Sequence, residues 1–380
     1  MNRMERLRVK LARYCPPVLP VCLVYALISL GMLLYAKGNA PAADMLNHWY
    51  GGAVRIVMAY LTLLLPFSAA EFLLLASPLL AGSLIALAVY CGKKGLHAAV
   101  RFVALLVSLG LLVFSLFVAG LGLGYYETTL ADKLELEDKS VTAEELAETM
   151  DWLIDESNAL CGDVSFVFDG RSYMPFETLD AMCRDLMIGY ARFSQDCPSF
   201  YRFSSHVKPV ILSVPMSYTH ITGIYTFFTG EANLNVDFPD YTLPFTAAHE
   251  LAHQRGFARE KEANFVAFMV TIKSDDPYTR YSGYVNMLEY VSNALYSADR
   301  ELWNAEMGKL DRRVRGEMNA YSRFYEKYRD SKAAEVSDKL NDTYLKMQGQ
   351  EAGSKSYGLV VDLTVAYYEK EIKGADAGEG

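Results

Sequence analysis

The first third of the chain is dominated by long apolar runs that no charge interrupts. Residues 18–36 form one run of 19 residues, which at the helical rise of 1.5 Å per residue covers a hydrocarbon core of about 30 Å. Residues 72–91 and 102–126 form two more. Because such runs are rare in soluble cores, we predict three membrane spans. Residues 53–66 are apolar but too few to span, so we expect a membrane-surface or re-entrant helix there.

From residue 127 the pattern is typical of a globular domain. Thr142 and Glu145 form a capping-box pattern that predicts a helix over 141–158. β-Branched and aromatic residues separated by glycines predict strands at 210–214, 223–228 and 232–236. Further helices are expected over 176–190, 245–255, 259–274, 279–297, 300–330, 332–347 and 357–372. The predicted fold class is α+β, mostly α: three N-terminal transmembrane helices are followed along the chain by a domain that contains a small β-sheet.

Charge divides the chain in the same way. Residues 1–124 carry ten Lys or Arg against three acids, whereas the remainder carries 26 against 42. We therefore expect a membrane domain over 1–126 and a second domain over 127–380. With 52% hydrophobic residues the chain is not a disordered protein, and its net charge of −9 argues against a nucleic-acid partner.

The basic residues also predict an orientation in the lipid bilayer. Five of the first 13 residues are Lys or Arg and segment 92–101 holds three more, whereas segment 37–71 holds two basic and two acidic residues. Positive loops stay in the cytoplasm, so the N-terminus is expected there and residues 127–380 outside. The first run exceeds the apolar core of a signal peptide and further spans follow, which favours a retained anchor in the plasma membrane.

The clearest chemical motif is H-E-x-x-H at residues 249–253. On a helix, His249 and His253 lie on one face, so both imidazoles can bind one Zn²⁺. Glu250 lies one residue further round and is predicted to act as the general base of a hydrolysis. A chance match is disfavoured, because the chain has only six histidines. We expect one zinc ion per chain.

A catalytic zinc needs a third protein ligand. Gly256 stands where the metzincin pattern has its turn, but the ligand position of that pattern is Arg259, whose guanidinium has no lone pair to donate. The next acids are Glu260 and Glu262. We favour Glu260, because it shares one helical stripe with positions 263, 264 and 267, and Glu262 is the alternative.

The run from Glu260 to Asn264, E-x-x-A-N, resembles the E-x-x-A-D segment of the gluzincins. That resemblance implies that Glu260 binds zinc and that Asn264 hydrogen-bonds a ligand histidine.

Other residues are candidates to shape the site. The predicted strand at 232–236 could form the upper edge of a cleft and pair with an extended peptide, or be a plain core strand. Tyr225, His220 and Tyr357 are candidates to stabilise an oxyanion, although each is more often structural. Glu231 could be a surface acid at a strand end or a hydrogen-bond partner of a zinc-binding histidine, and we favour the surface position.

Several segments together resemble a known family. They read GIY at 223–225, FTGEAN at 228–233, the H-E-x-x-H run up to residue 265, YSGY at 281–284 and KSYG at 355–358. They resemble an uncharacterised bacterial membrane family, the domain of unknown function 3810, over nearly the whole chain. The resemblance implies a zincin-like membrane protein and carries no substrate.

The motif and the spans together predict a membrane-anchored zinc metallopeptidase. Its partners would be the bilayer and a peptide or protein substrate, bound in extended form. A zinc hydrolase acting on a non-peptide bond of the cell envelope is an alternative. Another is a non-catalytic membrane sensor or scaffold with a zinc site, although a purely structural site would not need Glu250.

Overall fold

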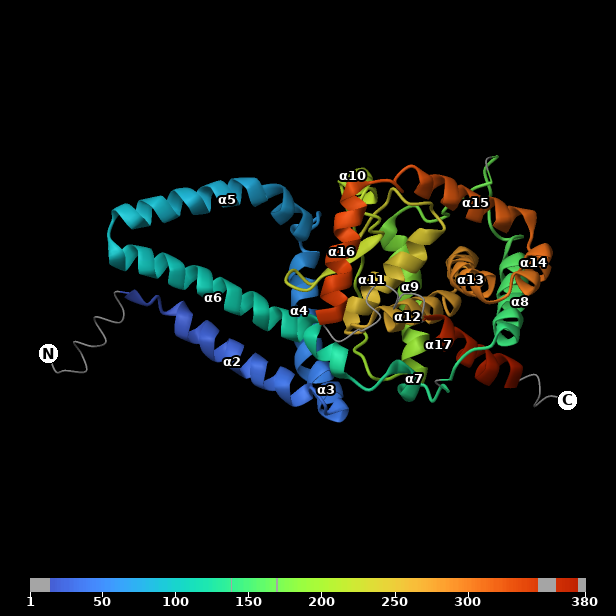
Figure 1. Ribbon diagram of the computed structural model, residues 1–380, viewed down its shortest axis with the longest axis horizontal. Helices are drawn as coiled ribbons and strands as arrows, with labels where there is room; N and C mark the ends of the chain where they lie inside the picture. The colour runs from blue at the N-terminus through green and yellow to red at the C-terminus, as the bar shows by residue number, and fades with distance from the viewer. Residues whose placement is uncertain (1–13, 138, 169, 348–359, 375–380) are drawn as a thin grey trace.

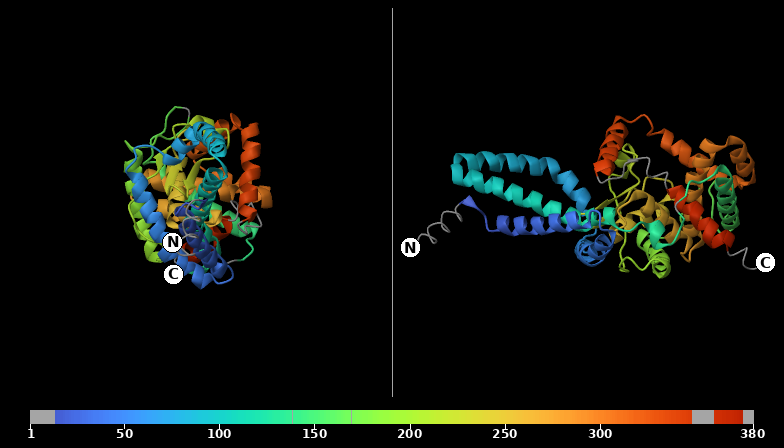
Figure 2. Two further views of the ribbon diagram at one scale, coloured as in Figure 1. Left: turned by 90° about the vertical axis from the view of Figure 1, so that its left-hand side faces the viewer. Right: turned by 60° about the horizontal axis from the view of Figure 1, so that its bottom comes forward.

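The computed structural model describes residues 14–137, 139–168, 170–347 and 360–374. Three of its helices are long and apolar enough to cross a membrane: α2 (Val18–Ala36), α5 (Ala69–Lys93) and α6 (Leu96–Gly120). They project from one side of a globular domain (Figure 1; Figure 2, right). Helix α2 packs beside α6, and in the view of Figure 1 α5 leaves α6 and diverges from it toward the domain. The three predicted spans are confirmed as membrane-length helices.

The predicted C-terminal limit of the third span is wrong. Helix α6 ends at Gly120, and the chain turns into the 3₁₀ helix η2 (Gly122–Tyr126). Leu123 and Tyr125 are buried there, and a Cβ on Gly124 would lie 2.5 Å from the carbonyl oxygen of Gly256. The apolar run continues past the span because its last residues pack on protein, and sequence alone does not distinguish that burial from contact with lipid.

Residues 53–66, predicted as a surface or re-entrant helix, belong to a helical junction. It consists of α3 (Ala40–Leu46), the π-turn η1 (Asn47–Gly51) and α4 (Gly52–Leu63). Helix α4 crosses the ends of the long helices in Figure 1 and packs against α6, α11 (Thr242–Arg255) and strand β3 (Glu231–Leu234). The segment therefore lies between the long helices and the globular domain.

Arg55 of α4 is the centre of this junction. Its side chain is 3% exposed and donates hydrogen bonds to Asn47 Oδ1 (2.7 Å) and to the carbonyl of Ala119 at the end of α6 (3.0 Å). It also donates to the carbonyl of Asn47 (3.0 Å) and, at 3.4 Å, to that of Arg255. Asn47 Nδ2 in turn donates to the carbonyl of Gly256 (3.2 Å). One guanidinium thus links three helices.

A second set of contacts fixes the start of α5. Glu231, expected at the surface, is 2% exposed and forms an ion pair with Lys208 (2.7 Å). Its carboxylate accepts hydrogen bonds from the first backbone N–H groups of α5, where an anion is favoured by the helix dipole. Glu71 of α5 reciprocates by accepting from the backbone N–H groups of Ile211 and Leu212. The surface expectation for Glu231 was wrong, because its partner lies far away in the sequence.

The globular domain is mostly helical. Its α8 begins after Thr142, which with Glu145 forms the predicted capping box. Helix α12 is the central one, buried along residues 262–270 between α9, α11, α13 and α17. In addition to α11, the helices are α7 (Leu130–Lys133), α8 (Ala143–Leu160), α9 (Leu179–Asp196), α10 (Ser213–Ser217), α12 (Glu260–Ile272), α13 (Pro277–Ala298), α14 (Arg300–Lys309), α15 (Arg312–Glu326), α16 (Lys332–Met347), α17 (Val360–Tyr367) and the π-turn η4 (Tyr368–Lys373).

Two predicted elements of this domain were wrong. The helix expected over 300–330 breaks into α14 and α15, because Leu310 is extended and Asp311 caps α15 by accepting a hydrogen bond from the backbone N–H of Arg313. No strand forms over 210–214. The paired strand β1 (Lys208–Pro209) ends just before this range, and α10 begins within it at Ser213. Ser213 Oγ there donates to the carbonyl of Val210, a local bond that competes with strand pairing.

The sheet has three strands in the order β1-β3-β2, where β2 is Gly223–Thr226. Strand β3 lies in the centre, parallel to β1 and antiparallel to β2. Strand β2 is therefore an edge strand, and its position matters for the site below.

The junction generates a stability prediction. Arg55→Ala leaves several buried carbonyl groups without a donor, each costing roughly 1–3 kcal/mol. We expect the free energy of unfolding to fall by about 3 kcal/mol or more, seen as a lower thermal midpoint of the purified full chain in detergent. Arg184→Ala, at an exposed position of α9, is the control and should change the free energy of unfolding by less than about 0.5 kcal/mol. Equal midpoints for the two variants would show that the junction does not depend on Arg55.

Candidate metal centre

The histidine pair lies near the C-terminus of α11. His249 and His253 are one turn apart, and the helix ends at Gly256, whose φ is +106°. Position 256 requires glycine for two reasons: its φ is left-handed, and a Cβ there would lie 2.5 Å from Arg55 Nη2. The turn sends the chain directly back into α12, whose first residue is Glu260.

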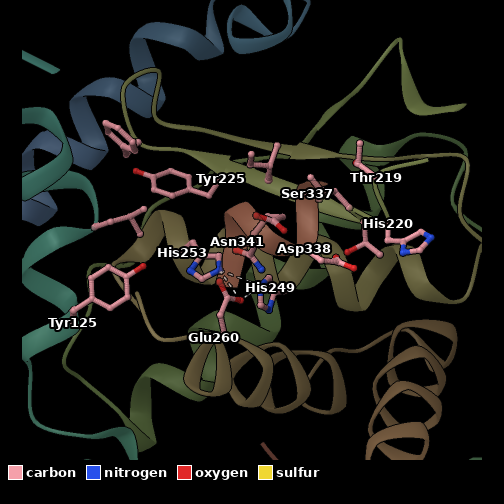
Figure 3. Close-up of a pocket in the computed structure, with 17 residues that line it drawn as sticks. Tyr125, Thr219, His220, Tyr225, His249, His253, Glu260, Ser337, Asp338 and Asn341 are labelled. Atoms are coloured by element: carbon pink, nitrogen blue, oxygen red, sulfur yellow. Dashed lines mark hydrogen bonds and ion pairs between the residues drawn. The ribbon is translucent and has the colours of Figure 1, made fainter. Parts of the chain in front are cut away.

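Three side-chain atoms converge across this turn (Figure 3). His249 Nε2 and His253 Nε2 are 3.0 Å apart, and Glu260 Oε2 lies 3.3 Å from the first and 3.6 Å from the second. Zn²⁺ with bonds of about 2.0–2.1 Å in tetrahedral geometry places its ligand atoms about 3.3 Å apart. The three atoms therefore match the spacing of a zinc site, and two imidazoles with one carboxylate are a donor set typical of a catalytic zinc.

Hydrogen bonding prepares His253 for this role. Its Nδ1 lies 2.7 Å from the carbonyl of Phe257, which fixes the proton on that nitrogen and leaves the Nε2 lone pair for a metal. Burial lowers the pKa of His253, but the carboxylates of Glu260 and Glu250 raise it to about 9. For Glu260 burial has the opposite effect and raises the pKa, but the two histidines outweigh it and lower the pKa below its ordinary value. The carboxylates thus favour a cation at this point, either a proton on His253 or a metal ion in its place.

Glu262, the alternative third ligand, faces a different part of the molecule. It accepts hydrogen bonds from the backbone N–H of Leu130 (3.0 Å) and from Arg259 (2.8 Å). Arg259 also donates to the carbonyls of Tyr125 and Glu127. Glu262 therefore anchors the chain that follows α6, and Glu260 is the acid that joins the two histidines.

Glu250, the predicted general base, is buried at the wall of the same cavity. It accepts a hydrogen bond from the backbone N–H of Tyr225 in β2. A Cβ on Gly223 would come within 2.6 Å of the Glu250 side chain, so only glycine fits there. Burial raises the pKa of Glu250, and His249 and His253 oppose the shift.

The free edge of β2 borders this site. The N–H of Asn235 donates to the carbonyl of Thr222 (2.9 Å), so the alternation of antiparallel pairing turns the backbone groups of Gly223 and Tyr225 away from β3. Of the two roles left open for the strand at 232–236, the structure shows the core strand, because β3 already has a neighbour on each side. Its antiparallel partner β2 offers the available edge.

The cavity at the site has a volume of about 460 Å³. Its walls come from β2 and the loop before it, from the turn that follows α6, and from α16, which contributes Ser337, Asp338 and Asn341 (Figure 3). The part of the chain near the membrane helices supplies Leu121 and Tyr125. Residues on both sides of the predicted boundary at 126 therefore build one cavity.

The three residues predicted to stabilise an oxyanion differ in their positions and hydrogen-bond partners. Tyr225 lines the cavity, but its buried hydroxyl points away from the histidines and has no hydrogen-bond partner among the described residues (Figure 3). His220 uses Nδ1 with the Tyr325 hydroxyl and Nε2 with the Tyr328 carbonyl. Tyr357 lies outside the described residues.

Sequence reasoning missed Tyr125, whose hydroxyl points toward His253 and Glu260 in Figure 3. It sits in the last turn after α6, inside a run that reads as membrane span. No local signal separates it from lipid-facing residues, since only the turn of η2 directs it to the cavity.

Asn264, predicted to support a ligand histidine, is 3% exposed. Its Nδ2 and His249 Nδ1 are both buried without a hydrogen-bond partner among the described residues. Both side chains line a second cavity, which has a volume of about 420 Å³.

Comparison with known proteins identifies a family and no activity. The sequence model described as "Protein of unknown function (DUF3810)" matches residues 47–365. No curated protein and no solved structure matches the chain.

The geometry predicts different effects on zinc affinity for substitutions of Glu260 and Glu262, which are only two residues apart. Glu260→Gln should weaken zinc binding tenfold or more, because a neutral amide replaces the anionic ligand, whereas Glu262→Gln should weaken it less than about threefold. Zinc affinities of the two full-length variants, measured by competition with a chelating dye, test this. The assignment of Glu260 is refuted by a larger loss for Glu262→Gln.

Proposed function

This chain belongs to the DUF3810 family, and we propose that it is a membrane-anchored zinc metallopeptidase. The observation that carries the proposal is the convergence of His249, His253 and Glu260, with ligand atoms 3.0–3.6 Å apart, beside the buried Glu250. When bound, Zn²⁺ supplies polarisation of the scissile carbonyl and a water whose pKa falls to about 7.

The residues of the chain have distinct tasks in this mechanism. Glu250 takes the proton of the attacking water and passes it to the leaving amine. Its burial and the hydrogen bond that it accepts from the Tyr225 backbone N–H hold the carboxylate at the cavity wall. The Tyr125 hydroxyl is the side-chain donor directed at the metal group and is suited to the developing oxyanion.

An extended peptide fits the free edge of β2. The outward carbonyl groups of Gly223 and Tyr225 can accept hydrogen bonds from a peptide backbone laid antiparallel or parallel to the strand. Such pairing holds the substrate by its main chain, which favours a peptide over a non-peptide envelope bond. The buried Glu250, directed at the metal-site cavity, disfavours a sensor or scaffold with a purely structural zinc.

The orientation proposed for the protein places the globular domain outside the cell. The turn between α5 and α6, which carries Lys93 and Lys94, lies at the same end as the start of α2 and opposite the domain (Figure 1). Three crossings with both basic segments in the cytoplasm leave the domain on the outer face of the plasma membrane.

Glu250→Gln tests the catalytic proposal. Loss of the general base should lower kcat by roughly 10²–10⁴-fold in a peptide-library cleavage assay with the full chain in detergent. Zinc content should stay at one ion per chain, since Glu250 is not among the three converging ligands. Cleavage by Glu250→Gln at the wild-type rate would exclude this role.

Protease protection tests the orientation. With an epitope tag at each end, protease added to cells stripped of their outer layers should remove the C-terminal tag and spare the N-terminal one. The opposite pattern would place the domain in the cytoplasm.

A further inference from the structure

A second cavity opens on the other side of His249. His249 and Thr222 line both this cavity and the one at the metal group, so the two are neighbours. Its remaining walls come from α11, α12, α13 and α15. A volume of about 420 Å³ is ample for one side chain of a substrate.

The side chains that line this cavity can carry negative charge. Glu289 of α13 contributes a carboxylate, and no Lys or Arg lines the cavity within the described part of the chain. Amide side chains at Asn286 and Asn293 add hydrogen-bond acceptors, and Tyr290 and Tyr321 add aromatic rings, a residue type that attracts cations. Carboxylate, amide oxygens and aromatic faces together recognise an ammonium or guanidinium group.

Two further observations indicate a built site. Tyr241 donates to Glu289 at 2.6 Å, which orients the carboxylate, and burial raises the pKa of Glu289 to about 7. A cation bound beside it would offset that burial. Asn264, 3% exposed on the same wall, keeps a buried Nδ2 donor without a partner among the described residues. An ammonium or guanidinium group has no acceptor for this donor, but a backbone carbonyl of the bound peptide can accept its hydrogen bond.

We propose that this cavity is a specificity pocket for a basic side chain, of lysine or arginine type, on a residue flanking the scissile bond. The proposal rests on the proposed peptidase function. A peptide held along β2 passes the metal group, and His249, shared by both cavities, puts the pocket within reach of the residue next to the cleaved bond. Glu289 receives the cationic end of that side chain.

Matched peptides test the pocket with the full zinc-loaded chain. Each set carries lysine, norleucine or glutamate at one position, on either side of the cleaved bond. Wild type should show kcat/KM at least tenfold higher for lysine than for norleucine on one of the two sides. Glu289→Gln should reduce that ratio at least fivefold, whereas Glu301→Gln, at an exposed acid of α14, should keep it.

A second variant does not disturb the buried carboxylate. Asn293, exposed while lining the cavity, can be changed to lysine, and Asn293→Lys should reverse the preference toward the glutamate peptide. Cleavage of lysine and norleucine peptides at equal rates by wild type would overturn the pocket and leave the peptidase function standing.

A binding measurement decides the case in which no peptide is cleaved, which would count against the proposed function. Calorimetry with n-butylamine and with butyrate then tests the pocket alone. Binding of the amine at least fivefold tighter to wild type than to Glu289→Gln, with no such difference for butyrate, supports the pocket. Equal amine affinity in the two proteins overturns it.

Discussion

The buried guanidinium of Arg55 is the contact on which the arrangement of the site depends. It binds the last turn of α6 through Ala119 and, with Asn47, the carbonyls of Arg255 and Gly256. Those two carbonyls belong to the turn that brings α12 back against α11. Because buried carbonyl groups need donors, the position of that turn is tied to the helices near the membrane. The approach of Glu260 to the histidines follows from it.

The chain directly after α6 is therefore part of the site, and the long helices support it. Leu121 and Tyr125, just after α6, line the metal-site cavity, and Glu231 of the central strand caps α5. A substrate bound at the metal group would lie beside the end of α6. This arrangement ties the position of α6 to the geometry of the cavity.

Two acids with the same chemistry have different roles because of what lies opposite each of them. Glu260 faces the histidines across the turn, and Glu262, two residues later, faces Leu130 and Arg259. The first completes a group of side chains that could hold a metal ion. The second holds the chain that leads from α6, and so helps to place Tyr125. The first turn of α12 thus serves both the candidate metal group and the connection to α6.

The sequence by itself determined the features that depend on local spacing. These are the three apolar spans, the capping box at Thr142, and the histidine pair, whose separation of four residues on a helix decides that both face one point. The preference for Glu260 also rested on helical periodicity. Only the tertiary structure decided the edge role of β2, the burial of Glu231 and the direction of Tyr125, because their partners lie far away along the chain. A local pattern records which residues are apolar or charged, whereas the surface that each one meets is set by packing between distant segments.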